Sequence, residues 1–432
     1  MKIEIQHGNI LTLDDENRII QDGIVCIDGT KIIYAGTERP KNFIPDKIIH
    51  AEGNLVMPGF VNTHCHSPMT MFRNFAGGLP LQKWMFENIR PLQQYVTEEE
   101  IRSCAKLAYI EMIKSGTTAF AEMYAWADIL GEIASDMGLK ALIAGSYGKD
   151  QGLAGTTEKS VIREHSKKLS ERSKGRIEEG LLLHALYSVP EDIIRNTVEF
   201  AKEAGFCIQI HVSETKKEIE DCYEKYGVTP VEKLAELGVF DVPAIAAHCV
   251  YLADNDYSIL KEHHVCVSHC PVSNLKLGSG MADISKLDKK GITVCLGTDG
   301  AASNNNLNIF KEMNIAALLA KGIHCDSTVI PAEKILRMAV NNGYKALGIE
   351  NSGCIKAGMN ADLIIVSTKE PHFTPITDYY DALVYSGQAS DVVLTMVDGN
   401  ILMENRELAN CDEEKILAEA KRASQKILSY RL

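Results

Sequence analysis

The amino-acid sequence predicts an α/β protein built on a (β/α)8 TIM barrel, with β-rich segments at both ends of the chain. Apolar β-rich runs alternate with helical segments through the middle of the chain, which is typical of parallel βαβ units. Counted with the run that opens this alternation, the candidate strands reach eight. A closed barrel suits this count better than an open sheet, and such barrels routinely exceed the usual length of about 150 residues per domain.

The candidate barrel strands are short runs of aliphatic and β-branched residues. They occupy residues 56–64, 117–123, 140–147, 181–187, 206–212, 244–250, 265–270 and 292–298. The helix after the first strand has clear end signals, because Thr97 and Glu100 make a capping box and Gly116 stands where a C-cap glycine belongs. Further helical segments cover residues 192–205 and 228–238.

Both ends of the chain differ from the middle, because they consist of short strands and tight turns. Residues 24–36 are two β-rich runs joined by Asp28-Gly29, and residues 392–404 repeat this pattern around Asp398-Gly399. Both are strong hairpin signals. These ends could be two small β elements or a single β-domain assembled from both termini, and the pattern alone does not choose between them.

Composition and charge exclude several classes of protein. The formal net charge of −13 argues against a nucleic-acid partner, since such proteins usually carry a basic patch. No apolar run is long enough to span a membrane, and the first residues lack the apolar core of a signal peptide. We therefore expect a cytoplasmic protein whose twelve cysteines are reduced and mostly buried.

The clearest chemical signal is a pair of histidines directly after the first candidate strand. On an extended backbone, residues two apart face the same way, so His64 and His66 can bind one metal ion while Cys65 points away. An isolated pair of this kind is more often found in a surface loop. Its place after an apolar strand favours the metal site, because catalytic groups of such barrels lie at the carboxyl ends of strands.

Three further polar residues follow later strands and complete the candidate site. His211 and Asp299 end two strands, and they would make a ligand set of three imidazoles and one carboxylate with the first pair. Zinc suits that set, and iron or manganese would also be accommodated. Glu214 follows His211 by three residues, where a general acid/base can reach a water molecule without binding the metal. Taken singly, a loop glutamate is usually solvated and an aspartate between glycines usually forms a turn.

His248 and His269 end two other strands but are not needed as ligands. Either could be a structural histidine; a direct role is favoured for His248, and the role of His269 stays open. Cys65, Cys249 and Cys270 adjoin the histidines, but strand alternation turns them away. We interpret these three cysteines as packing residues.

Taken together, these motifs resemble the amidohydrolase superfamily, in its branch of chlorohydrolases, triazine hydrolases and nucleoside-type deaminases, and most closely the 5-methylthioadenosine/S-adenosylhomocysteine deaminases. The matching segments are VMPGFVNTHCHSPMTMFR, EMIKSGTTAFAEMY, HVSET, AAHCVYL, VSHCPVSNLKLGSG and GTDGAASNNNLNIFKEM. The resemblance implies a small composite β-sandwich domain from both termini (residues 1–54 and 354–432) and a barrel over residues 55–353. It also implies one divalent metal ion held by His64, His66, His211 and Asp299.

The resemblance further implies that Glu214 shuttles a proton and that His248 contacts the attacking water, with Asp299 as a third catalytic residue. Candidate substrate contacts depart from the family pattern. A glutamate expected nine residues after Trp84 is Gln93, and two expected arginines fall at Gly145 and Thr157. The histidine expected after the fourth strand aligns with Tyr187. The candidate substrate-binding residues are Trp84, Gln93, Tyr187 and His269.

The predicted activity is hydrolytic deamination of an amino-substituted N-heterocycle, such as an adenine nucleoside or a related nucleobase. One alternative is hydrolytic displacement of chloride or an alkylamine from a triazine-type ring. An alternative of another class is a non-catalytic scaffold, which is disfavoured because such relatives lose metal ligands. The partners expected are a small heterocyclic substrate and further copies of the chain, with neither nucleic acid nor membrane.

Overall fold

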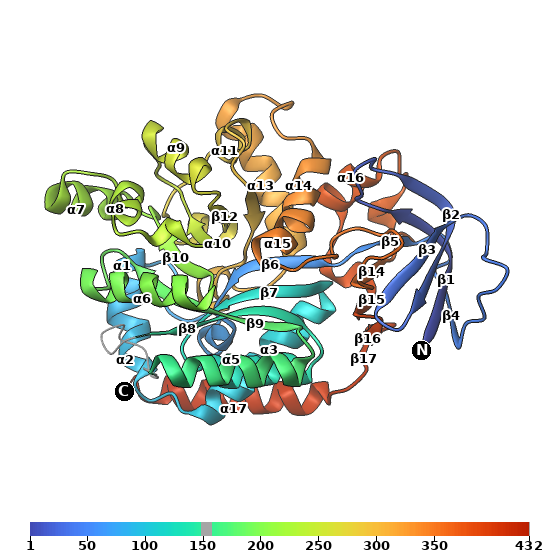
Figure 1. Ribbon diagram of the computed structural model, residues 1–432, viewed down its shortest axis with the longest axis horizontal. Helices are drawn as coiled ribbons and strands as arrows, with labels where there is room; N and C mark the ends of the chain where they lie inside the picture. Colours follow the sequence, from blue (N-terminus) through green and yellow to red (C-terminus); the bar gives the residue numbers. More distant parts are fainter. Residues whose placement is uncertain (148–157, 432) are drawn as a thin grey trace.

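The computed structural model describes residues 1–147 and 158–431. A parallel barrel surrounded by helices forms the larger part of the molecule, and a second sheet made from both ends of the chain lies to its side (Figure 1). This arrangement confirms the predicted barrel and the predicted composite β-domain. No helix in the described part of the chain is long and apolar enough to cross a membrane.

The barrel is an eight-stranded sheet in which each strand is parallel to its neighbours, in the order β13-β12-β11-β10-β9-β8-β7-β6. Strand order therefore follows the chain, as the alternating pattern predicts. The strands are β6 (Phe60–Cys65), β7 (Thr117–Met123), β8 (Lys140–Ser146), β9 (Ile177–Ala185), β10 (Ile208–Val212), β11 (Ala244–His248), β12 (Cys266–His269) and β13 (Val294–Leu296).

Helices cover the outside of the barrel and carry its loops. The longer ones are α3 (Glu98–Lys114), α4 (Ala127–Asp136), α5 (Lys159–Ser173), α6 (Glu191–Ala204), α7 (Lys216–Tyr226), α8 (Pro230–Glu236), α9 (Asp254–Glu262), α13 (Ile309–His324), α14 (Ala332–Ala339) and α17 (Glu413–Ser429). The shorter ones are η1 (Ser67–Phe72), α1 (Leu81–Lys83), η2 (Trp84–Ile89), α2 (Arg90–Gln93), η3 (Val239–Asp241), α10 (Pro271–Lys276), α11 (Ile284–Lys289), α12 (Ala301–Asn304), α15 (Asn341–Ala346), η4 (Pro371–Phe373), α16 (Tyr379–Asp381), η5 (Ala382–Ser386) and η6 (Ala389–Asp391). The capping box at Thr97 is present and begins α3 as expected.

The barrel closes where its last strand meets its first. The backbone N–H of Asp299 donates to the carbonyl of His64 at 2.9 Å. Just before these two residues, the side-chain amide of Asn62 exchanges two hydrogen bonds with Thr298, at 2.7 and 3.0 Å, and the hydroxyl of Thr63 donates to the carbonyl of Leu296. Side chains thus replace much of the regular ladder at this seam.

The second sheet has nine strands, and its central strands come from opposite ends of the chain. Its order is β17-β16-β15-β14-β5-β1-β2-β3, with β4 beside β1. The strands are β1 (Lys2–Leu11), β2 (Ile19–Asp28), β3 (Lys31–Gly36), β4 (Lys47–His50), β5 (Leu55–Pro58), β14 (Leu363–Val366), β15 (Val392–Val397), β16 (Asn400–Glu404) and β17 (Glu407–Leu408). The hairpins expected around Asp28-Gly29 and Asp398-Gly399 join β2 to β3 and β15 to β16.

The structure differs from the sequence expectation in two elements. The run over residues 56–64 is two strands, because β5 pairs in the terminal sheet and only β6 belongs to the barrel. The chain passes between the sheets at Gly59, where an added Cβ would lie 2.2 Å from Thr118. The second difference is α17, which follows the terminal sheet but returns to pack beside α3 (Figure 1). Domain boundaries at residues 54 and 354 stay a prediction.

A buried charge cluster joins the two sheets. The Lys140 ammonium, at the start of β8, lies 2.6 Å from a carboxylate oxygen of Asp362 and 2.7 Å from one of Asp398, both in the terminal β-region. The side chains of Lys140 and Asp362 are 5% and 0% exposed. Removal of the cation would leave buried carboxylates without compensation, which is far more costly than the loss of an exposed pair.

We expect Lys140→Met to lower the free energy of unfolding by about 3–5 kcal/mol. Urea denaturation followed by circular dichroism measures this change. Lys168→Met is the matched control, because Lys168 pairs with Glu164 on an exposed helix surface and such pairs contribute little. Equal stability of the two variants would contradict the structural role given to Lys140.

Candidate metal centre and active site

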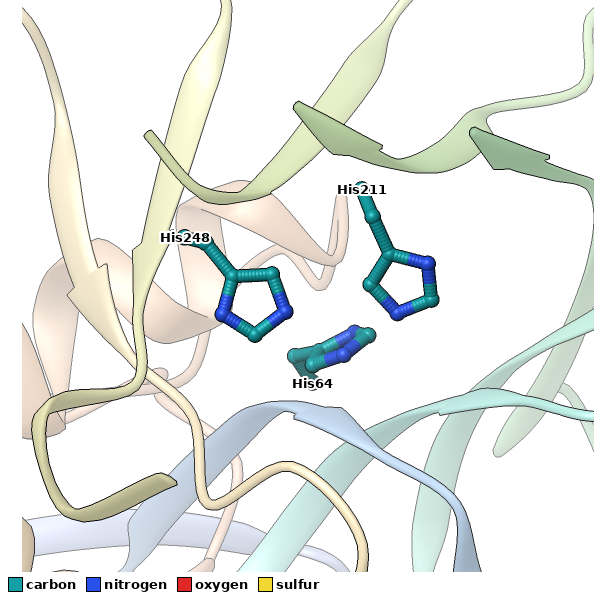
Figure 2. Close-up of side chains that lie close together, drawn as sticks. All are labelled: His64, His211 and His248. Carbon is teal, nitrogen blue, oxygen red and sulfur yellow. The ribbon is translucent and has the colours of Figure 1, made fainter. Parts of the chain in front are cut away.

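Imidazoles converge at the carboxyl ends of the barrel strands. His64 lies near the end of β6, His211 near the end of β10 and His248 at the end of β11, and Figure 2 shows their rings directed toward one another. The candidate ligand atoms form two overlapping groups, His64 with His211 and His248, and His64 with His66 and Asp299, each within 4.8 Å. All the metal ligands expected from the sequence are therefore brought together.

The distances within this cluster suit a single ion. The Nε2 atom of His66 lies 3.2 Å from Oδ1 of Asp299 and 3.3 Å from Nε2 of His211. The Nε2 atom of His64 lies 3.7 Å from the same carboxylate oxygen. These separations are those of atoms that share a small cation, whose ligand bonds are about 2 Å long.

The surroundings of three imidazoles prepare them to bind a cation. His66 and His211 each place Nδ1 against a backbone carbonyl, that of Met123 at 2.5 Å and that of His184 at 2.7 Å. A donated Nδ1–H leaves the Nε2 lone pair free for a metal. The Nε2 of His64 is buried without a hydrogen-bond partner. Burial, followed by a neighbouring imidazole, holds the pKa values of His64 and His211 well below their usual range, so both rings are neutral.

His248 has the opposite arrangement. The side-chain amide Nδ2 of Asn274 donates to Nδ1 of His248 at 3.0 Å, and an Nδ1 that accepts this bond leaves the N–H of the ring on Nε2. This proton faces the cluster and Glu214, whose Oε2 is 3.9 Å away. His248 is therefore oriented to donate a hydrogen bond rather than a lone pair, which fits a contact to water better than a metal ligand.

Glu214 lies above the cluster in a loop that is held by hydrogen bonds. Its Oε1 accepts a hydrogen bond from the Ser279 hydroxyl at 3.0 Å. The carboxylate of Glu218 accepts from the backbone N–H groups of Ser213 and Glu214, at 2.9 and 2.8 Å, and so fixes the loop. Burial raises the pKa of Glu214 against the opposing effect of His248. A carboxyl with a raised pKa is suited to take and return a proton near neutral pH.

Asp299 is held in one orientation by three donors. Its Oδ2 accepts from the hydroxyls of Ser273 and Ser303, at 2.5 and 2.8 Å, and its Oδ1 accepts from the backbone N–H of Gly300. The backbone of Asp299 has a φ of 60°, and that of His248 a φ of 76°. Left-handed backbone outside glycine costs of order 1–3 kcal/mol per residue and is concentrated at functional sites.

A cavity of about 800 Å³, including open space at its mouth, lies above the cluster. Its floor is formed by His66, His211, His248, Glu214 and Asp299. Its walls carry Trp84, Gln93 and Tyr187, which are three of the substrate contacts expected from the sequence. His269 is 2% exposed and does not line the cavity among the described residues. The structure therefore gives no support to a substrate contact for His269.

The structure shows the surroundings of two positions that depart from the family pattern, Tyr187 and Gly145. A histidine, His184, lies three residues before Tyr187, and its ring lines the cavity 5.0 Å from that of His211. A Cβ at Gly145 would point toward Ala127 and Glu179, so that position does not face the cavity. Thr157 lies outside the described residues.

Several residues of the site were not predicted from the sequence. His184 and Asn274 hold or adjoin the imidazoles, Ser279 contacts Glu214, and Arg90 lines the cavity wall. His184 could have been found, since it ends an apolar run. Asn274 and Ser279 lie within the segment VSHCPVSNLKLGSG. Arg90 gives no such signal, because its helix looks like any amphipathic segment.

The fold and the site together define the class of the protein: a (β/α)8-barrel enzyme whose active site lies at the carboxyl ends of the strands. The sequence profile of the amidohydrolase family matches residues 55–402, and the chain belongs to that family.

More specific similarities come from three individual proteins. The chain is 45% identical to a 5-methylthioadenosine/S-adenosylhomocysteine deaminase of Acetivibrio thermocellus, over 99% of this chain and all of that protein. It is 40% identical to a 5'-deoxyadenosine deaminase of Methanococcoides burtonii, over 99% of this chain and 98% of that one. A crystal structure of a Xanthomonas campestris adenosine deaminase with bound zinc superposes with a TM-score of 0.92 at 28% identity, covering 99% and 98% of the two chains.

We expect removal of a bound divalent ion by a chelator to lower the melting temperature, and zinc to restore it. An ion at 100 times its dissociation constant stabilises the native state by about 2.7 kcal/mol. Differential scanning calorimetry and elemental analysis measure the two effects, with about one equivalent of metal per chain expected.

The variant His64→Ala should lose this metal and its stabilisation. His50→Ala is the control, because His50 is exposed on the terminal sheet away from the cluster. Full metal content in His64→Ala would show that the ion binds elsewhere.

Proposed function

We propose that the protein is a metal-dependent deaminase that hydrolyses the exocyclic amino group of an adenine-nucleoside-like substrate. The observation that carries this proposal is the position of Glu214, buried above the histidine and aspartate cluster inside the cavity and 3.9 Å from His248. The names of the similar proteins, which are deaminases of adenine nucleosides, support the same substrate class.

We propose His64, His66, His211 and Asp299 as the ligands of one divalent ion, most simply zinc, with iron or manganese as alternatives. When bound, such an ion would make a water molecule acidic enough to attack at neutral pH. The bound zinc of the Xanthomonas campestris enzyme supports this choice. The proposal extends to a cytoplasmic homo-oligomer that acts on a small molecule.

The protein's own residues then transfer two protons from the attacking water to the substrate. Glu214 takes a proton from the attacking water and delivers it to the ring nitrogen next to the reacting carbon. This protonation neutralises the negative charge that moves onto the ring nitrogen while the new C–O bond forms. Asp299 takes the second proton and passes it to the amino group, the C–N bond breaks, and ammonia leaves. His248 donates a hydrogen bond from Nε2 that holds the attacking oxygen in place.

Deamination is favoured over displacement of chloride from a triazine-type ring by this proton shuttle. Ammonia leaves readily only after protonation, whereas chloride leaves as an anion without a proton. A buried carboxyl with a raised pKa beside the cluster therefore matches an amine leaving group. A non-catalytic scaffold is disfavoured, because the site keeps the expected ligands and this carboxyl.

We expect Glu214→Gln to keep its metal and fold and to lose about 10²–10⁴-fold in turnover, since the amide cannot shuttle a proton. Ammonia release from 5'-deoxyadenosine and methylthioadenosine measures the rate, and elemental analysis measures the metal. Glu224→Gln, on the exposed surface of α7, is the matched control. Parent-like turnover in the Glu214 variant would overturn the role given to it.

We expect Ser279→Ala to lower kcat/KM roughly tenfold at neutral pH, because hydrogen bonds to charged groups contribute about 1.5–3 kcal/mol. The Ser279 hydroxyl favours the ionised form of Glu214, so its loss raises that pKa further. Glu214 acts as a base only when ionised. The acid limb of the pH profile should therefore move to higher pH, and Ser279→Thr should restore it. An unshifted limb would argue against this contact.

A further inference from the structure

One wall of the active-site cavity is a single short helical segment, residues 81–93, formed by α1, η2 and α2. Seven of its side chains line the cavity: Leu81, Gln82, Trp84, Met85, Phe86, Arg90 and Gln93. Residues Trp84–Ile89 form a π-helix, an irregularity that is often associated with functional sites. This wall faces the metal cluster across the cavity and contributes none of its ligands.

Arg90 places a positive charge in this wall, and the described residues offer it no hydrogen-bond acceptor. Its side chain is half-buried, and its guanidinium carbon lies 4.7 Å from the centre of the Phe86 ring. Within residues 1–147 and 158–431, no carboxylate or carbonyl accepts a hydrogen bond from it. Among the described cavity residues it is the single Lys or Arg. A guanidinium has five donors, so most of its hydrogen-bonding capacity faces the cavity or solvent.

The charge of Arg90 reaches other residues of the cavity. Arg90 lines the same cavity as His184 and Tyr187. It also acts on the hydroxyl of Tyr187, which lies on the same side as His184, the two rings being 6.0 Å apart. Arg90 therefore adds positive potential at the end of the cavity bordered by these two side chains.

Gln93 lies three residues further along the same helix, and so on the same face as Arg90. Its Nε2 donates to the hydroxyl of Tyr124 at 3.1 Å. An amide here leaves the guanidinium uncompensated, whereas a carboxylate at this position would pair with it. The carboxylates among the described lining residues are Glu214 and Asp299. Glu214 accepts a hydrogen bond from one serine hydroxyl, and Asp299 accepts from two serine hydroxyls and a backbone N–H.

We propose that Arg90, with the neutral Gln93 beside it, is a specificity site that selects a substrate carrying an anionic group, a carboxylate or a phosphate, at the end remote from the reacting ring. The inference rests on the proposed function for the position of the ring at the metal cluster. A ligand that fills the cavity removes water from the half-buried guanidinium, which costs free energy unless the ligand replaces the lost hydrogen bonds. A bound anion removes that cost through two parallel N–H···O bonds of the planar guanidinium.

Calorimetric binding to the zinc-loaded Glu214→Gln protein tests the inference without turnover. The probes are 5'-deoxyadenosine as the neutral ligand, S-adenosylhomocysteine for a carboxylate and adenosine 5'-monophosphate for a phosphate. We expect at least one anionic probe to bind about 10- to 100-fold more tightly than the neutral one, the range for hydrogen bonds to charged groups. Arg90→Met should abolish that ratio, and the probe that loses most identifies the anion.

Two further variants keep the test decisive. Gln93→Glu places a carboxylate beside Arg90 and should also reduce the preference for anions, even if Arg90→Met does not fold. Lys83→Met is the matched control, because Lys83 is an exposed cation of the same segment that does not line the cavity; it should keep the full ratio. Preference for the neutral probe, or an equal loss for all probes in Arg90→Met, would overturn the inference.

Failure of the proposed function gives a different result. If the parent protein releases no ammonia from any of the three probes but still binds an anionic probe through Arg90, the specificity site stands and the proposed deamination falls. If ammonia is released at the same kcat/KM from neutral and anionic probes, deamination stands and the specificity site falls.

Discussion

The active site depends on the seam at which the barrel closes. The hydrogen bond from the Asp299 backbone to the His64 carbonyl joins the ends of the last and first strands, and so brings two candidate ligands from distant parts of the chain within 3.7 Å. Because β13 is short and pairs with β6 mainly through Asn62, Thr63 and Thr298, the same contacts that close the barrel also set the spacing of the metal cluster. A change that disturbs closure of the barrel would therefore also disturb the geometry of the candidate ligands.

Around this seam, the site is rigid because each functional group has a partner on its far side. Backbone carbonyls orient His66 and His211, Asn274 orients His248, and two serines orient Asp299. Left-handed backbone at His248 and Asp299 turns these side chains over the barrel mouth. The packing of the strands beneath offsets the energetic cost of this strain and of burying several imidazoles together. Such an offset is expected where a site is pre-organised for chemistry.

Much of this arrangement could be predicted from the sequence, because the carboxyl ends of parallel strands must meet at one end of a barrel. The positions of His64, His66, His211 and Asp299 follow from that rule. The division of the first apolar run at Gly59 could not be predicted, since both halves are equally apolar and only the close approach of Thr118 distinguishes them. The return of α17 onto the barrel depends on tertiary contacts such as Ser424 with the Met71 carbonyl, which no local pattern records.

Three of the residues that escaped prediction, Arg90, Asn274 and Ser279, lie outside the strand ends, whereas His184 is the second-last residue of β9. Chemistry in this barrel comes from the strand ends, whereas the cavity wall comes from the helical segment of Arg90 and Gln93. That segment is braced by the end of the C-terminal helix region, where Tyr430 stacks on Tyr95 with ring centres 4.3 Å apart. A wall held by peripheral packing can change its side chains without disturbing the ligands at the seam. The side chains of this cavity wall, Arg90 among them, can therefore change independently of the candidate metal ligands.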